Sequence, residues 1–220
     1  MQKIMFNDRF WLTYDVLGGR KTQTRRIITC PSTYKGQYVA GFHVYRNASG
    51  FFQVVPYDEE EHDFETFIRP RYKIGEVVAV AQSYLDIAEE LEDCNNASCA
   101  GEYEKRLEKA SHYSGYLYHP GFTNKMFTSA EDMIHYIQIT DVRVERLQEI
   151  SDDDCLKEGI MKMLTNAEYY TYCFFDEKKW VWIDHSTPRE AFADLINRTC
   201  GKGTWDKNPY VFAYEYKLLK

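Results

Sequence analysis

One segment, residues 134–147, constrains the fold more than any other part of the chain. Apolar and polar residues alternate along it, as expected of a β-strand with one buried face. The apolar positions are odd-numbered as far as Ile139 and even-numbered from Val142 onward. Because successive side chains of a strand point to opposite faces, this change of phase requires one extra residue. The sequence therefore predicts a long strand with a β-bulge near Thr140-Asp141.

Other strands and helices are predicted on both sides of this segment. Aromatic and β-branched runs predict strands over 22–28, 77–81 and 210–218, and hairpins over 37–55 and 169–183. Capping residues and apolar spacing predict helices over 6–17, 151–158 and 187–200, and the charged stretch 87–110 also reads as helical, followed by a loop over 111–124. Strands outnumber helices without a regular β-α-β alternation. This pattern favours a mixed α+β fold around a small β-barrel over a doubly wound sheet.

Length and composition limit the class of protein. A chain of 220 residues with 44% hydrophobic residues fits one large domain with a packed core. No stretch reaches the roughly 18 apolar residues of a membrane-spanning helix. The first residues also lack the apolar run of a signal peptide. We therefore expect a cytoplasmic protein without a membrane partner, whose six cysteines are free thiols.

The charge distribution distinguishes one short segment from the rest of the chain. The net charge is −7, which argues against a protein that coats nucleic acid non-specifically. Four cations nevertheless occupy seven residues, at Arg20, Lys21, Arg25 and Arg26. The cluster indicates a focused basic site on an acidic body. A solvated basic turn explains the same charges equally well.

The same segment carries groups capable of nucleophilic chemistry. A threonine nucleophile needs a base, and a lysine serves as one only when burial or neighbouring cations lower its pKa. Lys21 and Thr24 are three residues apart, so an extended strand would point them to opposite faces. They converge only if the turn at Gly19 persists through Thr22. In the alternative reading, the threonines simply face along a strand and the arginines pair with carboxylates.

The segment also resembles a known family. The pattern Gly-x-Lys-x-x-(Glu/Thr)-x-Arg is similar to the signature of ASCH domains, and it is filled here by Gly19, Lys21, Thr24 and Arg26. The form with threonine is similar to small bacterial N4-acetylcytidine amidohydrolases. Further blocks that resemble the family are 73–77, 144–160 and the carboxyl-terminal helix and strand. The whole chain resembles longer phage and prophage members of the family, through residues 19–26, 124–127, 142–148 and 205–209.

The resemblance implies a fold and two alternative functions. The fold is a single PUA-like barrel domain over 1–220, enlarged by insertions at about 29–71, 85–130 and 161–186. As a binding module, it would take RNA or a modified nucleoside in a basic cleft around Lys21–Arg26, without a cofactor. The binding residues would be Gly19, Arg20, Arg25, Arg26, Asn124, Lys125 and Trp205.

As an enzyme, the same cleft would hydrolyse the acyl amide of N4-acetylcytidine or a related compound. The resemblance then assigns Thr24 as nucleophile, Lys21 as base and Glu158 as the carboxylate that positions the lysine or the substrate. A carboxylate beside Lys21 opposes the lowered pKa that a base requires, so burial or the arginines must outweigh it. A third reading is a phage accessory protein that acts through protein contacts.

Two weaker patterns carry alternatives of their own. Cys94, Cys99, His112 and His119 approach the spacing of a zinc site, but the second gap is one residue too long, and we expect no metal. The aromatic hairpin from Tyr169 to Trp182 is able to stack bases, although packing on the barrel as a lid is the more common role of such rings.

Overall fold

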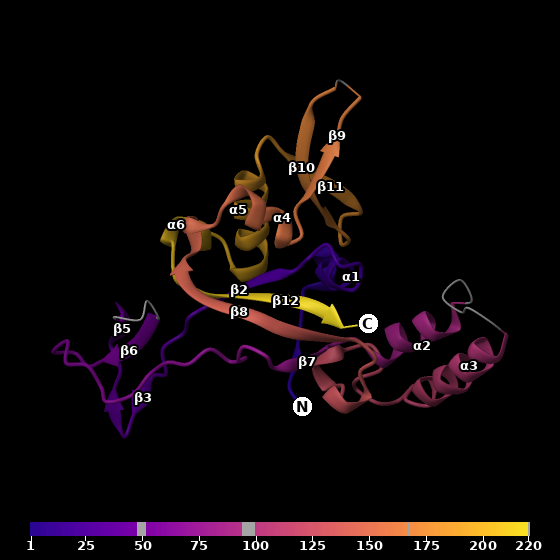
Figure 1. Cartoon of the computed structure of the whole chain (residues 1–220), viewed down its shortest axis with the longest axis horizontal. Helices are drawn as coiled ribbons and strands as arrows, with labels where there is room; N and C mark the ends of the chain where they lie inside the picture. Colours follow the sequence, from indigo (N-terminus) through magenta and orange to yellow (C-terminus); the bar gives the residue numbers. More distant parts are fainter. Residues whose placement is uncertain (48–51, 94–99, 167, 220) are drawn as a thin grey trace.

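The computed structural model describes residues 1–220 except 48–51, 94–99, 167 and 220. Its centre is a five-stranded sheet in the order β1-β7-β8-β12-β2 (Figure 1). The strands of this sheet are β1 (Lys3–Ile4), β2 (Gln23–Ile27), β7 (Val77–Val80), β8 (Tyr136–Arg146) and β12 (Tyr210–Leu219). The pairing of β1 with β7 is parallel and the other pairings are antiparallel.

The pairing of β8 with β12 confirms the predicted bulge. Asp141 lies opposite Glu215, whereas Ile139 lies opposite Tyr216, so Thr140 is the extra residue on β8. The extra residue keeps both Ile139 and Val144 in the hydrophobic core on either side of the bulge. The phase change in the sequence therefore corresponds to a real register shift.

The mixed α+β class is confirmed, but a closed barrel is not seen. Among the described residues, no pairing joins the two edge strands β1 and β2, so the sheet is open. The absence of closure leaves β2 as an edge strand. Residues from a neighbouring helix therefore have access to its free side.

Helices cover one side of the sheet near β2 and β12 (Figure 1). The longest is α5 (Pro188–Cys200), which begins with the predicted capping box of Thr187 and Glu190. Its residues Phe192, Leu195 and Ile196 enter the main core. The other elements of this layer are η1 (Asp8–Phe10), α1 (Leu12–Leu17), η5 (Leu147–Glu149), α4 (Asp152–Lys157) and α6 (Thr204–Lys207).

The three segments expected to be insertions lie outside the five-stranded sheet (Figure 1). The first contains two hairpins, β3 (Thr33–Tyr34) with β4 (Gln37–Tyr38) and β5 (Gly41–Arg46) with β6 (Phe52–Tyr57). The second contains α2 (Tyr84–Glu92), α3 (Ala100–Ser114), η3 (Lys125–Phe127) and η4 (Ala130–Asp132). The third is a small sheet of β9 (Met161–Leu164), β10 (Tyr170–Asp176) and β11 (Val181–His185).

Two local predictions were wrong. The helix expected over 6–17 is interrupted at Trp11, whose φ of 55° is left-handed. The indole of Trp11 packs 4.1 Å from the ring of Phe175 in β10, a contact from a distant part of the chain. The loop expected over 111–124 begins later, because α3 continues to Ser114. In both places tertiary packing overrides the local preference.

Candidate functional site

The turn between α1 and β2 directs Lys21 into the protein. Gly19 adopts a φ of 73°, which glycine accepts without strain. The backbone carbonyl of Asp15 then accepts hydrogen bonds from both Arg20 N and Lys21 N, at 2.9 and 3.0 Å. Thr22 N donates to the carbonyl of Lys157 at the end of α4 (2.9 Å). The turn bonds end at Lys21, because the oxygen of Thr22 already accepts from Tyr216 N of β12 (3.0 Å). The turn therefore does not persist through Thr22, although Lys21 and Thr24 still line one cavity.

Lys21 and Glu158 form a buried ion pair. Lys21 Nζ lies 2.6 Å from Glu158 Oε2 and 2.7 Å from the backbone oxygen of the same residue. Only 2% of Lys21 and 4% of Glu158 is exposed. Burial lowers the pKa of Lys21, even though the negative charge of Glu158 acts in the opposite direction. Burial therefore outweighs the carboxylate in its effect on the pKa of Lys21, as a base requires.

The end of α4 places Glu158 beside the edge strand. Ser151 caps the start of this short helix by accepting from Asp154 N, as predicted. Gly159 follows Glu158 with a φ of 104°, and a Cβ there would lie 3.1 Å from side-chain atoms of Asp15 and Leu12. Glycine is thus required both for the backbone conformation and for the close approach of α4 to α1.

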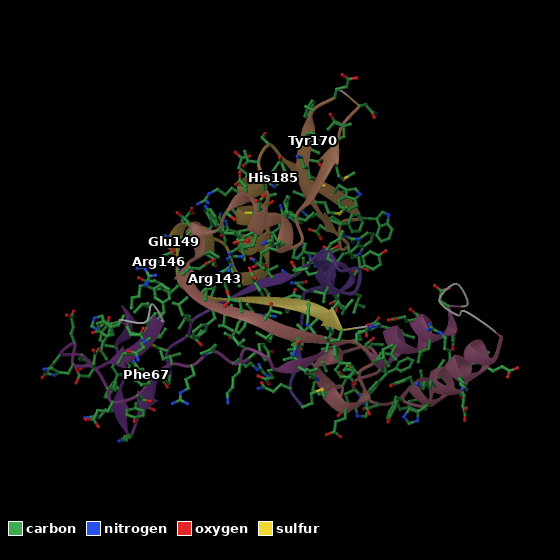
Figure 2. All side chains as sticks on the ribbon, in the orientation of Figure 1. Phe67, Arg143, Arg146, Glu149, Tyr170 and His185 are labelled. Carbon is green, nitrogen blue, oxygen red and sulfur yellow. The ribbon has the colours of Figure 1, made fainter. Side chains whose placement is uncertain are left out.

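Arg25 is held by three carboxylates on the same side of β2. Its Nη1 lies 3.0 Å from Glu158 Oε1, and its Nη2 lies 2.7 Å from Glu145 and 3.3 Å from Asp154. Arg143 on β8, labelled in Figure 2, also pairs with Glu145 and Asp154. Glu158 therefore bridges Lys21 and Arg25 at one end of a larger charged network.

Thr24 lies beside this ion pair in a small cavity of about 160 Å³, called here the inner cavity. Lys21, Thr24, Arg25, Arg26 and Glu158 line it together with apolar side chains of Phe6 and of α5, among them Phe192 and Leu195. Thr24 is 6% exposed, and within the described residues its hydroxyl makes no hydrogen bond and is not fully enclosed. The cavity is smaller than the roughly 300–1,000 Å³ of sites that bury drug-sized ligands. A cavity of this size takes only a small group, which both charged and apolar side chains would contact.

The other predicted cations differ in their surroundings. Arg20 is exposed and forms an ion pair with Asp15, and Arg25 is neutralised as described above. Arg26 is exposed and donates to the backbone oxygen of Met5 (2.5 Å). No carboxylate of the described residues lies within ion-pair distance of Arg26. Of the four clustered cations, only Arg26 retains unpaired positive charge toward solvent.

Five predicted binding residues are outside the inner cavity. Gly19 and Arg20 belong to the turn before β2, and the other three are Asn124, Lys125 and Trp205. Asn124 caps η3 by accepting from Met126 N (3.0 Å). Lys125 Nζ donates to the backbone oxygen of Phe6 and to Thr13 Oγ1, at 2.6 and 2.9 Å. Trp205 on α6 packs edge-on against Phe192, with ring centroids 6.1 Å apart. Their contacts hold neighbouring segments in place.

Several residues of the site had no sequence pattern that pointed to them. Thr199 and Cys200, at the end of α5, line the inner cavity. Asp15 neutralises Arg20, and Glu145 and Asp154 neutralise Arg25. The carboxylates are more than 100 residues from Arg25 in two of these cases. For Asp154, the sequence predicted only a position in the first turn of a helix, from the capping residue Ser151.

The aromatic hairpin packs against the body of the protein. Trp11 contacts Phe175, Trp180 and Trp182, with ring centroids 4.1, 6.4 and 6.2 Å apart. Tyr170, on the outer part of β10 in Figure 2, remains 55% exposed. These contacts favour the lid reading for the inner part of the hairpin.

Four of the six cysteines, and the two histidines of the zinc pattern, are among the described residues. Cys30, Cys155, Cys173 and Cys200 are free thiols. Cys94 and Cys99 lie outside the described residues, and His119 Nδ1 accepts from Gly121 N (2.9 Å). In the part of the chain that is described, no three His, Cys, Asp or Glu side chains are grouped to hold a metal ion.

A scan against protein-family models and searches of curated proteins and of solved structures found no match to this chain. Within the described residues, no helix is both long and apolar enough to cross a membrane.

Proposed function

We propose that the chain is an ASCH-type domain of PUA-like fold whose inner cavity binds a modified nucleoside, either free or within RNA. One observation supports this most. Lys21, Thr24 and Glu158, which the family resemblance selects from two distant segments, line one small cavity beside an open sheet edge. An unbonded hydroxyl, an ammonium and a carboxylate supply donors and acceptors for the polar edge of a base. The apolar wall of α5 supplies a surface for its ring.

The binding proposal is tested by titrating N4-acetylcytidine and cytidine into the wild type and into two threonine variants. We expect Thr24→Val to weaken binding of the nucleoside about tenfold, because one hydrogen bond in a buried site is lost. Thr22→Val is the matched control, since Thr22 belongs to the same segment and does not line the inner cavity. Equal loss in both variants, or no binding to the folded wild type, would reject the proposal.

A second candidate function, amide hydrolysis, is favoured by the unbonded Thr24 hydroxyl and the lowered pKa of Lys21. Thr24 Oγ would attack the acyl carbonyl carbon while neutral Lys21 takes the hydroxyl proton. Passing that proton to the exocyclic nitrogen releases cytidine and leaves an acyl ester on Thr24. Water would then hydrolyse the ester, which releases the carboxylic acid and restores the hydroxyl.

The enzymatic candidate is tested by following hydrolysis of N4-acetylcytidine at several pH values. We expect Thr24→Val to abolish turnover and Lys21→Met to reduce it at least about 100-fold, as is typical of a lost general base. Thr22→Val should retain the wild-type rate. A wild type that binds the nucleoside without releasing acetate leaves the domain as a recognition module.

A further inference from the structure

A second, larger pocket adjoins the inner cavity and has a different charge. It has a volume of about 400 Å³ and is lined by the cations Lys3, Arg26, Arg69 and Arg71, over an apolar floor that includes Phe212 and Tyr214. We call it the basic pocket. Met5 and Arg26 line both this pocket and the inner cavity. The two spaces therefore share a wall, which Arg26 near the end of β2 and Met5 after β1 form.

The positive charge of the basic pocket is not neutralised by the protein. None of its lining residues is acidic. In the described part of the chain, no carboxylate lies within ion-pair distance of Arg26, Arg69 or Arg71. These arginines are exposed, in a chain whose net charge is −7. Arg20 and Arg25, by contrast, are both paired with carboxylates.

Most hydrogen-bond donors of these arginines are also unused. Arg26 Nη2 donates to the backbone oxygen of Met5 (2.5 Å), and Arg71 Nε lies 3.5 Å from Gln2 Oε1. Each guanidinium carries five donors, so several remain for a ligand. Lys3 differs, because its ammonium donates to the backbone oxygens of Lys125, Met126 and Thr128. Lys3 thus adds charge rather than free donors.

The arginine charges act on the same floor of the pocket. Burial raises the pKa of Tyr72, and the charges of Arg71 and Arg26 both oppose that rise. The charge of Arg26 acts on Tyr214 in the same way. Arg26 and Arg71 therefore act together, although they come from β2 and from the insertion over 29–71. Phe67, labelled in Figure 2, belongs to the same insertion, which extends away from the sheet.

We propose that the basic pocket binds the phosphate of a nucleotide whose base enters the inner cavity, an inference that rests on the nucleoside site proposed above. Guanidinium groups bind phosphate oxygens through paired N–H donors, and an apolar floor strengthens that attraction. Arg26, between the two spaces, is placed to contact the sugar-phosphate link. The preferred ligand is then a nucleotide unit, as a monophosphate or within an RNA strand, and not the free nucleoside.

The test compares the affinities of four probes for the wild type. They are N4-acetylcytidine, its monophosphate, a short single-stranded RNA that contains one N4-acetylcytidine, and inorganic phosphate. We expect the phosphorylated probes to bind at least about tenfold tighter than the nucleoside, as one charge-assisted contact allows. The ratio between monophosphate and RNA then identifies the source of the phosphate.

Arginine variants assign the gain to the pocket. Arg69→Ala and Arg71→Ala should each remove most of the gain while leaving the affinity for the nucleoside unchanged. For the RNA probe, each should reduce the slope of log affinity against log salt concentration by about 0.7, the value of one phosphate contact on a single strand. Arg46→Ala is the matched control, because Arg46 is an exposed arginine of the same insertion that does not line the pocket.

The outcomes separate failure of this inference from failure of the nucleoside site. Nucleoside binding with no gain from the phosphate, or a gain that Arg46→Ala reduces equally, overturns the phosphate site alone. Inorganic phosphate that binds as tightly as the monophosphate overturns it too, because the base then contributes nothing. Absence of binding by the nucleoside and by both phosphorylated probes overturns both proposals together.

Discussion

Glu158 is the residue on which the buried charges of the site depend. One carboxylate oxygen accepts from Lys21 and the other from Arg25, at 2.6 and 3.0 Å. Arg25 retains Glu145 and Asp154 if Glu158 is removed, but Lys21 retains only a backbone oxygen. Replacing Glu158 therefore removes the carboxylate that is paired with the buried ammonium and leaves only the weaker attraction of Asp15. The cost of such a change is large compared with that of a surface substitution.

We predict that Glu158→Gln lowers the free energy of unfolding by about 3 kcal/mol, the cost of breaking a buried ion pair. Urea denaturation measures the change. Glu131→Gln is the control, because Glu131 is exposed and forms no ion pair among the described residues. A loss for Glu158→Gln no larger than for the control would show that the pair contributes nothing to stability.

A second prediction at this scale concerns pH. Burial lowers the pKa of Lys21 below its ordinary 10.5, so an unfolded Lys21 holds its proton to higher pH than a folded one. Between these two pKa values the unfolded state binds more protons, and stability rises with pH. The free energy of unfolding of the wild type should therefore increase relative to Lys21→Met as pH rises toward 10.5. A difference that falls with pH would mean that Glu158 dominates and the lysine is not a candidate base.

At the scale of elements, the hairpin β10–β11 is attached to the body through its inner end. Arg9 in η1 donates two hydrogen bonds to the fully buried carboxylate of Asp176, at 2.9 and 2.7 Å. Arg198 on α5 lies 3.6 Å from the same carboxylate. Together with the rings around Trp11, this joins η1, α5 and the hairpin into one packed layer.

We predict that Asp176→Asn destabilises the protein by about 2 kcal/mol, since hydrogen bonds to a charged group are lost. The pKa of Asp176 is lowered mainly by its hydrogen bond to Arg9, so this stability should also disappear as pH falls below the ordinary value of 3.8. Chemical denaturation at neutral and acidic pH measures both effects. Asp184→Asn, an exposed aspartate of the same hairpin, should change neither.

The elements also show which parts of the fold were predictable. The bulge on β8 and the capping box of α5 depend only on residues close together in the sequence. The alternation of apolar residues and the capping pattern therefore predicted them. The break at Trp11 depends on Phe175, which is remote in the sequence, and no local rule contains that contact. The sequence made the convergence of Lys21 and Thr24 conditional on a turn through Thr22. Instead, Thr22 bonds to Lys157 and Tyr216, two contacts from distant segments that no local rule contains.

At the scale of the whole molecule, charge is arranged differently from its order in the sequence. The cluster over 20–26 indicated one basic site, yet Asp15, Glu145 and Asp154 neutralise two of its arginines. Within that cluster Arg26 stays without an ion pair, and it lines the basic pocket together with Arg69 and Arg71 of another segment. Because ion pairing depends on tertiary contacts, sequence clustering located the region but not the exposed charge.

The packing of the whole molecule is also uneven. The main core joins the five-stranded sheet to α5, whereas α2 and α3 share a smaller core that includes Tyr84, Ile87 and Leu91. Segments with fewer buried contacts open at lower free energy. We predict that amides of α2 and α3 exchange with solvent deuterons faster than those of β8 and β12. Equal protection in native-state hydrogen exchange would indicate one cooperative unit instead.

The most direct test of the nucleoside site is a crystal structure of the wild type grown with N4-acetylcytidine. The account predicts the base in the inner cavity, with its polar edge within hydrogen-bond distance of Thr24 and Lys21 and its ring against Phe192 on α5. Cleaved ligand in the same place would favour the enzyme over the binding module. Ligand bound at another surface, with the inner cavity unoccupied, would contradict the account.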